Sequence, residues 1–159
     1  MLRRVCIALA GLLTASGCSE KAATDEAGFD VLADAADSHP EAEGTATVRS
    51  FANGTDVELS LRGLRPSTAY TAHVHDAPCD SSPVGGGHWQ NDPDGGTGPD
   101  NEIHMPFNSY ADGTAKVSAH SRHGEDEDMR AIVVHVDDVL DEYGMESDRV
   151  LCADLRPAG

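Results

Sequence analysis

Aromatic residues and positive charges are both scarce in this sequence of 159 residues. Phe, Trp and Tyr make up only 4% of it, so a core would consist mainly of Val, Leu, Ile and Ala. The 11 Lys and Arg residues stand against 28 Asp and Glu residues, a formal net charge of −17. This charge repels nucleic-acid backbones, and we therefore expect no nucleic-acid partner. The hydrophobic fraction of 39% is nevertheless that of a folded domain.

The sequence also lacks an apolar run long enough for a membrane-spanning helix in the mature protein. Its N-terminus, "MLRRVCIALAGLLTASGCSE", has two arginines before a short apolar run, which is typical of an export signal. "ASGC" resembles a bacterial lipobox. We predict a lipoprotein signal peptide over residues 1–17 and lipidation of Cys18, which would anchor the chain to the outer face of the cell membrane or in the periplasm. The alternative is an ordinary secretory signal that is cleaved nearby.

Cysteine is also rare, with four residues in the chain. Cys6 would leave with the signal and Cys18 would carry lipid, which leaves Cys79 and Cys152. Disulfides persist in exported proteins, so these two cysteines are predicted to form one pair. Two free thiols are the alternative.

The hydrophobic pattern divides the rest of the chain in two. Residues 18–43 are rich in Ala, Asp and Glu and are predicted to be an acidic tether that includes a solvated His39. From residue 44 to 159 apolar residues alternate with polar ones, which indicates strands over 44–52, 55–64, 70–76, 113–120, 129–136 and 149–155. The absence of a convincing long helix favours an all-β sandwich or barrel. Residues 80–108 lack this alternation and are predicted to be a long functional loop.

Four histidines in this domain form a candidate metal site. His73 and His75 are two residues apart in a predicted strand and therefore project from one face. His88 follows three glycines in the long loop, and His135 ends an apolar strand. Ligation by four imidazoles favours copper. Each histidine alone is also compatible with a solvated strand or a hydrogen-bonded core position.

Five segments from about residue 44 to residue 155 together resemble the copper/zinc superoxide dismutase family. In order along the chain they are "GLRPSTAYTAHVHDAPCD", "GGGHW", "GTAKV", "MRAIVVHVDD" and "RVLC". The resemblance implies an eight-stranded Greek-key β-barrel with a long metal-binding loop, which a Cys79–Cys152 disulfide ties to the last strand. It implies copper ligands at His73, His75, His88 and His135. It also implies that Arg149 binds superoxide and that His88 shuttles protons.

The sequence departs from the family at the zinc site and in the loop before Arg149. His104 is the only histidine in the second half of the long loop, and Phe107 stands where the family has an aspartate. Zinc bound by His88, His104 and one of Asp92, Asp94 or Asp100 is one interpretation. A second interpretation is a copper-only site, in which Glu102 or His104 holds His88. A third is a calcium ion bound in the acidic loop, and a fourth is a solvated loop without a metal. The loop between His135 and Arg149 is short and acidic, which is typical of the copper-only branch.

We therefore expect an exported enzyme that uses copper to convert superoxide to dioxygen and hydrogen peroxide. The sequence does not decide whether it also binds zinc. A copper-binding module for delivery or buffering is the alternative function, and a barrel without metal is a third. Superoxide and the membrane are the expected partners. A homodimer is compatible with the resemblance, but no residue of the sequence identifies an interface.

Overall fold

A computed structural model describes residues 23–124, 127–137 and 148–155. This part of the chain forms eight antiparallel strands and one short 3-10 helix, η1, over Ala33–Ala35. The strands are β1 (Ala23–Val31), β2 (Glu43–Phe51), β3 (Gly54–Arg62), β4 (Ala69–His75), β5 (His104–Asn108), β6 (Ala115–Ser121), β7 (Ala131–Val136) and β8 (Arg149–Asp154). The expectation of an all-β, eight-stranded barrel is confirmed.

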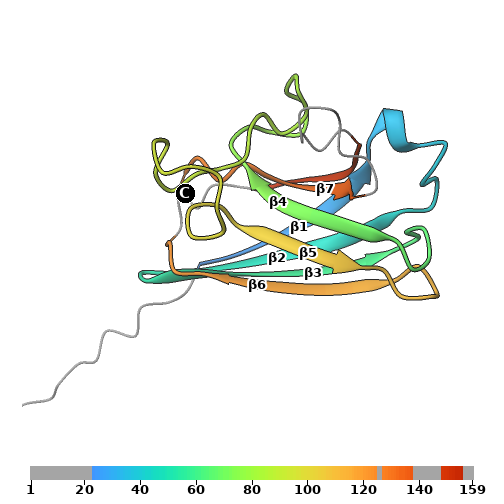
Figure 1. Ribbon diagram of the computed structural model, residues 1–159, viewed down its shortest axis with the longest axis horizontal. Coiled ribbons are helices and arrows are strands. Elements are labelled where there is room, and N and C mark those ends of the chain that lie inside the picture. Colours follow the sequence, from blue (N-terminus) through green and yellow to red (C-terminus); the bar gives the residue numbers. More distant parts are fainter. Residues whose placement is uncertain (1–22, 125–126, 138–147, 156–159) are drawn as a thin grey trace, which may run out of the picture.

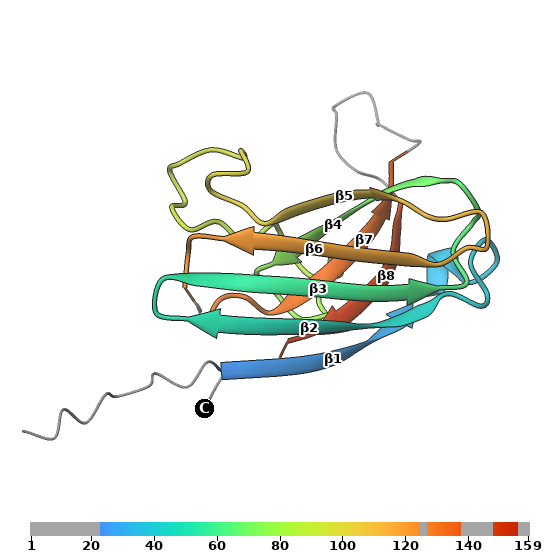
Figure 2. The ribbon, with the colours of Figure 1, turned by 90° about the horizontal axis from the view of Figure 1, so that it is seen from below.

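The strands follow one another around the barrel in the order β5-β4-β7-β8-β1-β2-β3-β6. The strands at the two ends of this order, β5 and β6, lie in contact, so the barrel is nearly closed. Connections β3–β4 and β6–β7 cross between strands that are not neighbours, which is the Greek-key pattern. Figure 2 shows β1, β2, β3 and β6 in front of β4, β7 and β8.

A hairpin joins β2 and β3, and its turn lies one residue earlier than the gap between the predicted strands 44–52 and 55–64. Phe51 pairs with Gly54, so Ala52 and Asn53 form the two-residue turn. Gly54 is needed beside the neighbouring strand, because a Cβ on it would lie 2.8 Å from the backbone oxygen of Ser121. Along both strands buried residues alternate with exposed ones, as expected for strands with one face on a core.

The interior of the barrel is filled mainly by aliphatic residues of moderate size. Tyr70 on β4 and Phe29 on β1 are the main aromatic contributions from the strands. The rest of the core joins residues of both halves of the barrel, including Ala46, Val57, Leu59, Val74, Ile132, Val134 and Leu151. The low aromatic content therefore does not prevent a continuous core.

The prediction of an acidic tether over residues 18–43 is wrong from Ala23 onward. Ala23–Phe29 pair with β2, and Asp30 and Val31 pair with β8, so this segment closes the barrel. His39 is not solvated: it is 2% exposed, and its Nε2 lies 2.9 Å from the hydroxyl of Tyr70. The domain therefore includes residues well before the predicted boundary at residue 44.

The predicted long loop also ends earlier than expected. Residues 104–108 form β5, which pairs with β4, so the loop between these strands covers residues 76–103. We call this segment the long loop below.

Two N-terminal predictions lie outside the described residues, namely the signal peptide over residues 1–17 and the lipidation of Cys18. Within the described ranges, no helix has the length and apolarity needed to cross a membrane.

Candidate metal centre

The candidate site lies on the outside of the barrel, between the sheet and the long loop. On β4 the side chains of Tyr70, Ala72 and Val74 enter the core, so His73 and His75 project from the opposite face. This outer face is not exposed to solvent, because His73 is 1% exposed and His75 is 0% exposed. In Figure 1 the green part of the loop rises above β4 and β7.

Strand register brings the other site residues to the same face. His104 on β5 lies directly opposite His73. His135 on β7 lies opposite Thr71, two positions along β4 from His73. Residues two apart on a strand share a face, and directly opposed residues on neighbouring strands do too. Three strands therefore contribute histidines to one patch.

A bulge in β8 turns Arg149 toward this patch. Leu151 pairs with Val134, and Arg149 pairs with His135. Val134 and His135 are adjacent on β7, whereas Val150 lies between their two partners on β8 and has no partner of its own on β7. Without this extra residue, Arg149 would point to the core side of the sheet. The bulge therefore places the half-buried arginine on the same side as His135.

His88 reaches the site from the long loop. His75 and His88 form an isolated antiparallel bridge, and the Trp89 N–H donates to the Val74 carbonyl over 2.9 Å. These bonds make residues 88–89 a short continuation of the sheet. Trp89 is 2% exposed and belongs to the core.

The four predicted copper-ligating histidines converge. One ring nitrogen from each of His73, His75, His88 and His135 lies within 4.8 Å of the others. The Nε2 atoms of His75 and His135 are 3.4 Å apart. Such a group could hold a metal ion.

The protonation state of His75 is suited to metal binding. Burial, together with the nearby charges of His88, His135 and Arg149, lowers the pKa of His75 to about 2, so its ring is neutral. A neutral imidazole is the form that binds metal. Its Nδ1 atom is buried and has no hydrogen-bond partner among the described residues. The other ring nitrogen of His75, Nε2, lies 3.4 Å from Nε2 of His135 and is the atom placed to bind an ion together with it.

A second group with metal-ligand spacing joins His88, Glu102 and His104. Glu102 Oε2 accepts from His88 Nδ1 over 2.9 Å and from His104 Nε2 over 2.6 Å. Gln90 Nε2 donates to the other carboxylate oxygen over 2.9 Å. Burial alone would raise the pKa of Glu102, but the hydrogen bonds from Gln90, His104 and His88 outweigh it and lower the pKa. Glu102 is therefore an ionised carboxylate that fixes the rings of two histidines.

Glu102 makes a hydrogen bond to His88, one of the two contacts that the copper-only interpretation expects, and the predicted aspartate ligands are not found near the site. Residues 91–100 are all exposed. Asp92 and Asn101 hold each other through backbone and side-chain hydrogen bonds, and Asp94 donates its N–H to the carboxylate of Asp92. Among the described residues, no group with metal-ligand spacing contains Asp92, Asp94 or Asp100. Neither the aspartate version of the zinc site nor the calcium site is supported by these positions.

The predicted disulfide is present between Cys79 and Cys152. It ties the long loop to β8, and the Cys79 N–H donates to Asp154 Oδ1 over 2.7 Å. Cys79 and Val84 pack on Val133 and Cys152, on the outer face beside the histidines. This small cluster holds the loop down over the sheet.

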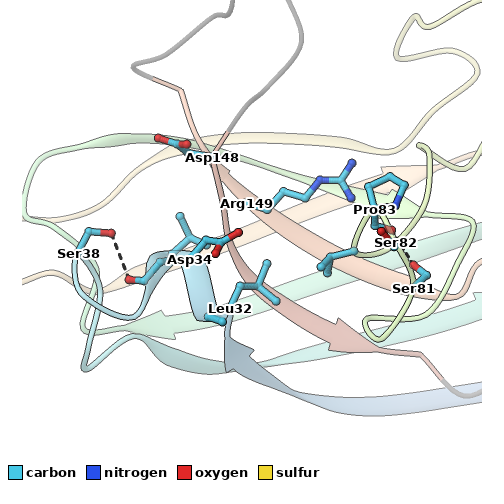
Figure 3. Close-up of a pocket in the computed structure, with 12 residues that line it drawn as sticks. Leu32, Asp34, Ser38, Ser81, Ser82, Pro83, Asp148 and Arg149 are labelled. Carbon is cyan, nitrogen blue, oxygen red and sulfur yellow. Dashed lines mark hydrogen bonds between the residues drawn. The ribbon is translucent and has the colours of Figure 1, made fainter.

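A cavity of about 550 Å³ opens beside Arg149. Its walls are η1, the first residues of β8 and residues 81–84 of the long loop (Figure 3). The side chain of Arg149 extends toward Ser82 and Pro83 in this view, and its Nη2 donates to the Gly86 carbonyl over 3.1 Å. Asp34 and Asp148 line the same cavity.

A comparison with solved structures shows the fold. The crystal structure of a mutant SOD-like protein from Bacillus subtilis matches with a TM-score of 0.55 and 20% sequence identity. The match covers 82% of this chain and 96% of that chain. Neither the protein-family models nor the curated proteins contain a match to this sequence. This chain has a SOD-like β-barrel fold.

Proposed function

We propose that this protein is a copper-dependent superoxide dismutase that acts outside the cytoplasm. The observation that carries the proposal is the convergence of four imidazoles within 4.8 Å, beside an arginine held in place by the loop. The SOD-like fold supports it.

Copper is the metal that fits these donors best. Four nitrogen donors and no sulfur or carboxylate favour copper over the harder cations. His73, His75 and His135 come from a rigid sheet, and His88 comes from a loop that the disulfide fastens. Copper, when bound, supplies the one-electron exchange by which one superoxide is oxidised to dioxygen and another, with two protons, is reduced to hydrogen peroxide.

A normal zinc site is not part of the proposal. His88, Glu102 and His104 could bind zinc only if the ion replaced two short hydrogen bonds to Glu102. Structural zinc sites usually have four protein ligands, and this group has three. We propose that Glu102 orients His88 in this protein, a task that zinc performs in the zinc-containing enzymes.

Arg149 is proposed to bind the substrate. Its guanidinium is half-buried at the cavity wall, where a small anion can reach it from solvent. A fixed guanidinium both attracts and orients such an anion. The chain is strongly acidic overall, but the Debye length at physiological salt is about 8 Å, so distant carboxylates are largely screened. Arg149 therefore acts at contact range.

His88 is proposed to deliver protons. Its side chain is 28% exposed, in contrast to the buried His73, His75 and His135. Nδ1 is held by Glu102, so Nε2 would be the nitrogen that holds the ion, and proton delivery would require Nε2 to be released from the ion before it takes up a proton for the reduced substrate.

The test is to load the purified full-length protein with copper and follow superoxide decay. We expect about one copper per chain and rapid catalysed decay, which falls strongly in Arg149→Ala and partly recovers in Arg149→Lys. Copper uptake without dismutation, unaffected by the arginine substitutions, would instead support the copper-delivery or buffering module. Metal analysis of the same sample measures zinc and decides whether the second group is occupied.

The proposed location is outside the cytoplasm, with a lipid anchor on Cys18 and superoxide as the small-molecule substrate. The Cys79–Cys152 disulfide supports an oxidising compartment. Fractionation of cells that express the wild type or Cys18→Ser tests the anchor: the wild type should be found with membranes and the variant in the soluble fraction. A homodimer stays a prediction, which analytical ultracentrifugation would test.

A further inference from the structure

Asp76, the first residue after β4, lies against Gly86 and Gly87, two of the three glycines that precede His88. The Gly87 N–H donates to Asp76 Oδ1 over 2.8 Å, and the Asp76 N–H donates to the Gly87 carbonyl over 3.0 Å. Gly87 is therefore fixed by two bonds to a single residue. His75 precedes Asp76 in the chain and His88 follows Gly87, so this contact joins two members of the four-histidine group.

The backbone of the glycines is shaped to close on this carboxylate. Gly85 and Gly86 have φ angles of 75° and 70°, a region that other residues rarely adopt. A Cβ on Gly86 would collide with Asp76 Oδ1, and a Cβ on Gly85 would lie 2.7 Å from Val133 Cγ2. Only glycine therefore allows the loop to approach both the carboxylate and the sheet.

The same turn also holds the arginine. The carbonyl of Gly86 accepts a hydrogen bond from Arg149 Nη2 over 3.1 Å. Gly86 and Gly87 are adjacent, so the acceptor for Arg149 is one residue away from the amide that Asp76 holds. A shift of this turn would move His88 and the contact of Arg149 together.

Asp76 is exposed, and its carboxylate makes no ion pair among the described residues. Its structural contribution is thus the hydrogen bond to Gly87 and not a salt bridge. This distinguishes Asp76 from Glu102, which contacts the ring of His88 directly.

We propose that Asp76 is a positioning residue that sets the spacing between His88 and Arg149, and thereby the fit of a small anion between them. The inference rests on the proposed function for its catalytic meaning, but its structural part can be measured without activity.

The first experiment uses metal-free protein. Asp76→Ala removes the acceptor, whereas Asp76→Asn keeps an oxygen at the same position and removes only the charge. We expect amide hydrogen exchange in a peptide covering residues 76–89 to become about tenfold faster in the alanine variant, as for loss of one hydrogen bond of about 1.4 kcal/mol. The asparagine variant should stay close to wild type. Equal exchange in all three proteins would overturn the proposal.

The second experiment uses copper-loaded protein and azide as the anionic probe. Copper content should stay near one per chain, while azide affinity, measured from the copper(II) absorption spectrum, falls about tenfold in Asp76→Ala, as for loss of a supporting contact around a metal site. Asp76→Asn should restore most of this affinity. If asparagine is as defective as alanine, the charge and not the hydrogen bond matters, and the proposal is wrong.

Asp112 provides the matched control. Its Oδ1 accepts from the N–H of Thr114 over 3.0 Å and from the Thr114 hydroxyl over 2.7 Å, in an exposed turn outside the long loop. Asp112→Ala should change neither azide affinity nor exchange of residues 76–89. If the wild type binds copper and azide but does not dismutate superoxide, the proposed function fails, and the inference about Asp76 is still decided by these two readouts.

Discussion

The two halves of the barrel use their outer faces differently. On β2 and β3 the outer residues are exposed or partly exposed and mostly polar, and burial alternates along each strand. On β4, β7 and β8 nearly every residue is buried on both faces, because the long loop covers the outside. The same strand geometry thus produces a solvated surface in one half and an enclosed polar site in the other.

This difference shows what a buried site requires. Burying polar groups costs free energy unless they find partners. In the covered half, Glu102 accepts from His88, His104 and Gln90, and the four-histidine group is spaced for an ion. In the solvated half, water can serve as the hydrogen-bond partner of polar groups. Arg49 and Glu58 therefore form an exposed ion pair that needs no other protein group around it.

The largest effect should come from removing one histidine of the covered half. His73→Ala should abolish binding of about one copper per chain, because three donors from different elements no longer surround the ion. The control is His120→Ala in the solvated half, where His120 is 67% exposed in its side chain and lies 2.6 Å from Asp56. Copper content of both variants, measured by mass spectrometry, checks this. Equal copper loss in both would remove the functional distinction between the halves.

The next effect concerns β1, which links the two halves by pairing with both β2 and β8. Phe29 is 5% exposed in the core, so Phe29→Ala should lower the free energy of unfolding by about 3–5 kcal/mol. Phe51→Ala is the matched control, because Phe51 is 39% exposed and its loss should cost less than about 1 kcal/mol. Urea denaturation of metal-free protein measures both. Similar values would mean that β1 does not contribute to the folded domain.

β1 also shows where sequence patterns are insufficient. Six strands of the domain are readable because apolar residues alternate over several positions. In β1 only Ala27, Phe29 and Val31 keep that alternation, and acidic residues surround them. Its strand state depends on pairing with β2 and β8, and β8 is more than a hundred residues away in the chain. Local composition therefore favoured a tether.

β5 was missed for a different physical reason. It has five residues and contains Pro106, which argues against a strand because proline cannot donate to a neighbour. β5 is at one end of the strand order, and Pro106 is exposed there, so this loss is tolerated. As a result, the position of His104 opposite His73 could not be predicted, since it depends on the register of an unrecognised strand.

The histidines of the candidate site could be predicted from the sequence, but its buried carboxylate, Glu102, could not be singled out. The spacing of His73 and His75 fixes their common face. The glycines before His88 and the apolar strand that ends at His135 made these two histidines candidates, and the family resemblance supplied Arg149. The long loop offers several acidic residues, and composition does not show which of them is buried. Glu102 is 3% exposed, whereas residues 91–100 remain exposed. Only the path of the loop over the sheet separates them.

Glu102→Gln tests that carboxylate. The amide keeps the size of the side chain but loses the charge and one acceptor, so His88 and His104 would lose part of their support. We expect copper affinity to fall about 10–100-fold, as for loss of an outer partner of a metal ligand. Competition with a copper chelator measures it. Glu58→Gln is the same substitution in the solvated half and should leave the affinity unchanged; a fall of similar size there would point to net charge instead of the specific contact.

The smallest effect should be found in the exposed pair of the solvated half. Arg49 Nη1 lies 3.0 Å from Glu58 Oε1, and the two side chains are 41% and 56% exposed. Water and salt screen such a pair, so a double-mutant cycle with Arg49→Ala and Glu58→Ala should give a coupling free energy below about 1 kcal/mol. Unfolding by urea at low and high salt provides the four stabilities, and the coupling should shrink as salt rises. A coupling of about 2 kcal/mol or more that persists at high salt would show that the outer face of β2 and β3 is as tightly organised as the covered half, and the contrast between the halves would then rest on the metal ligands alone.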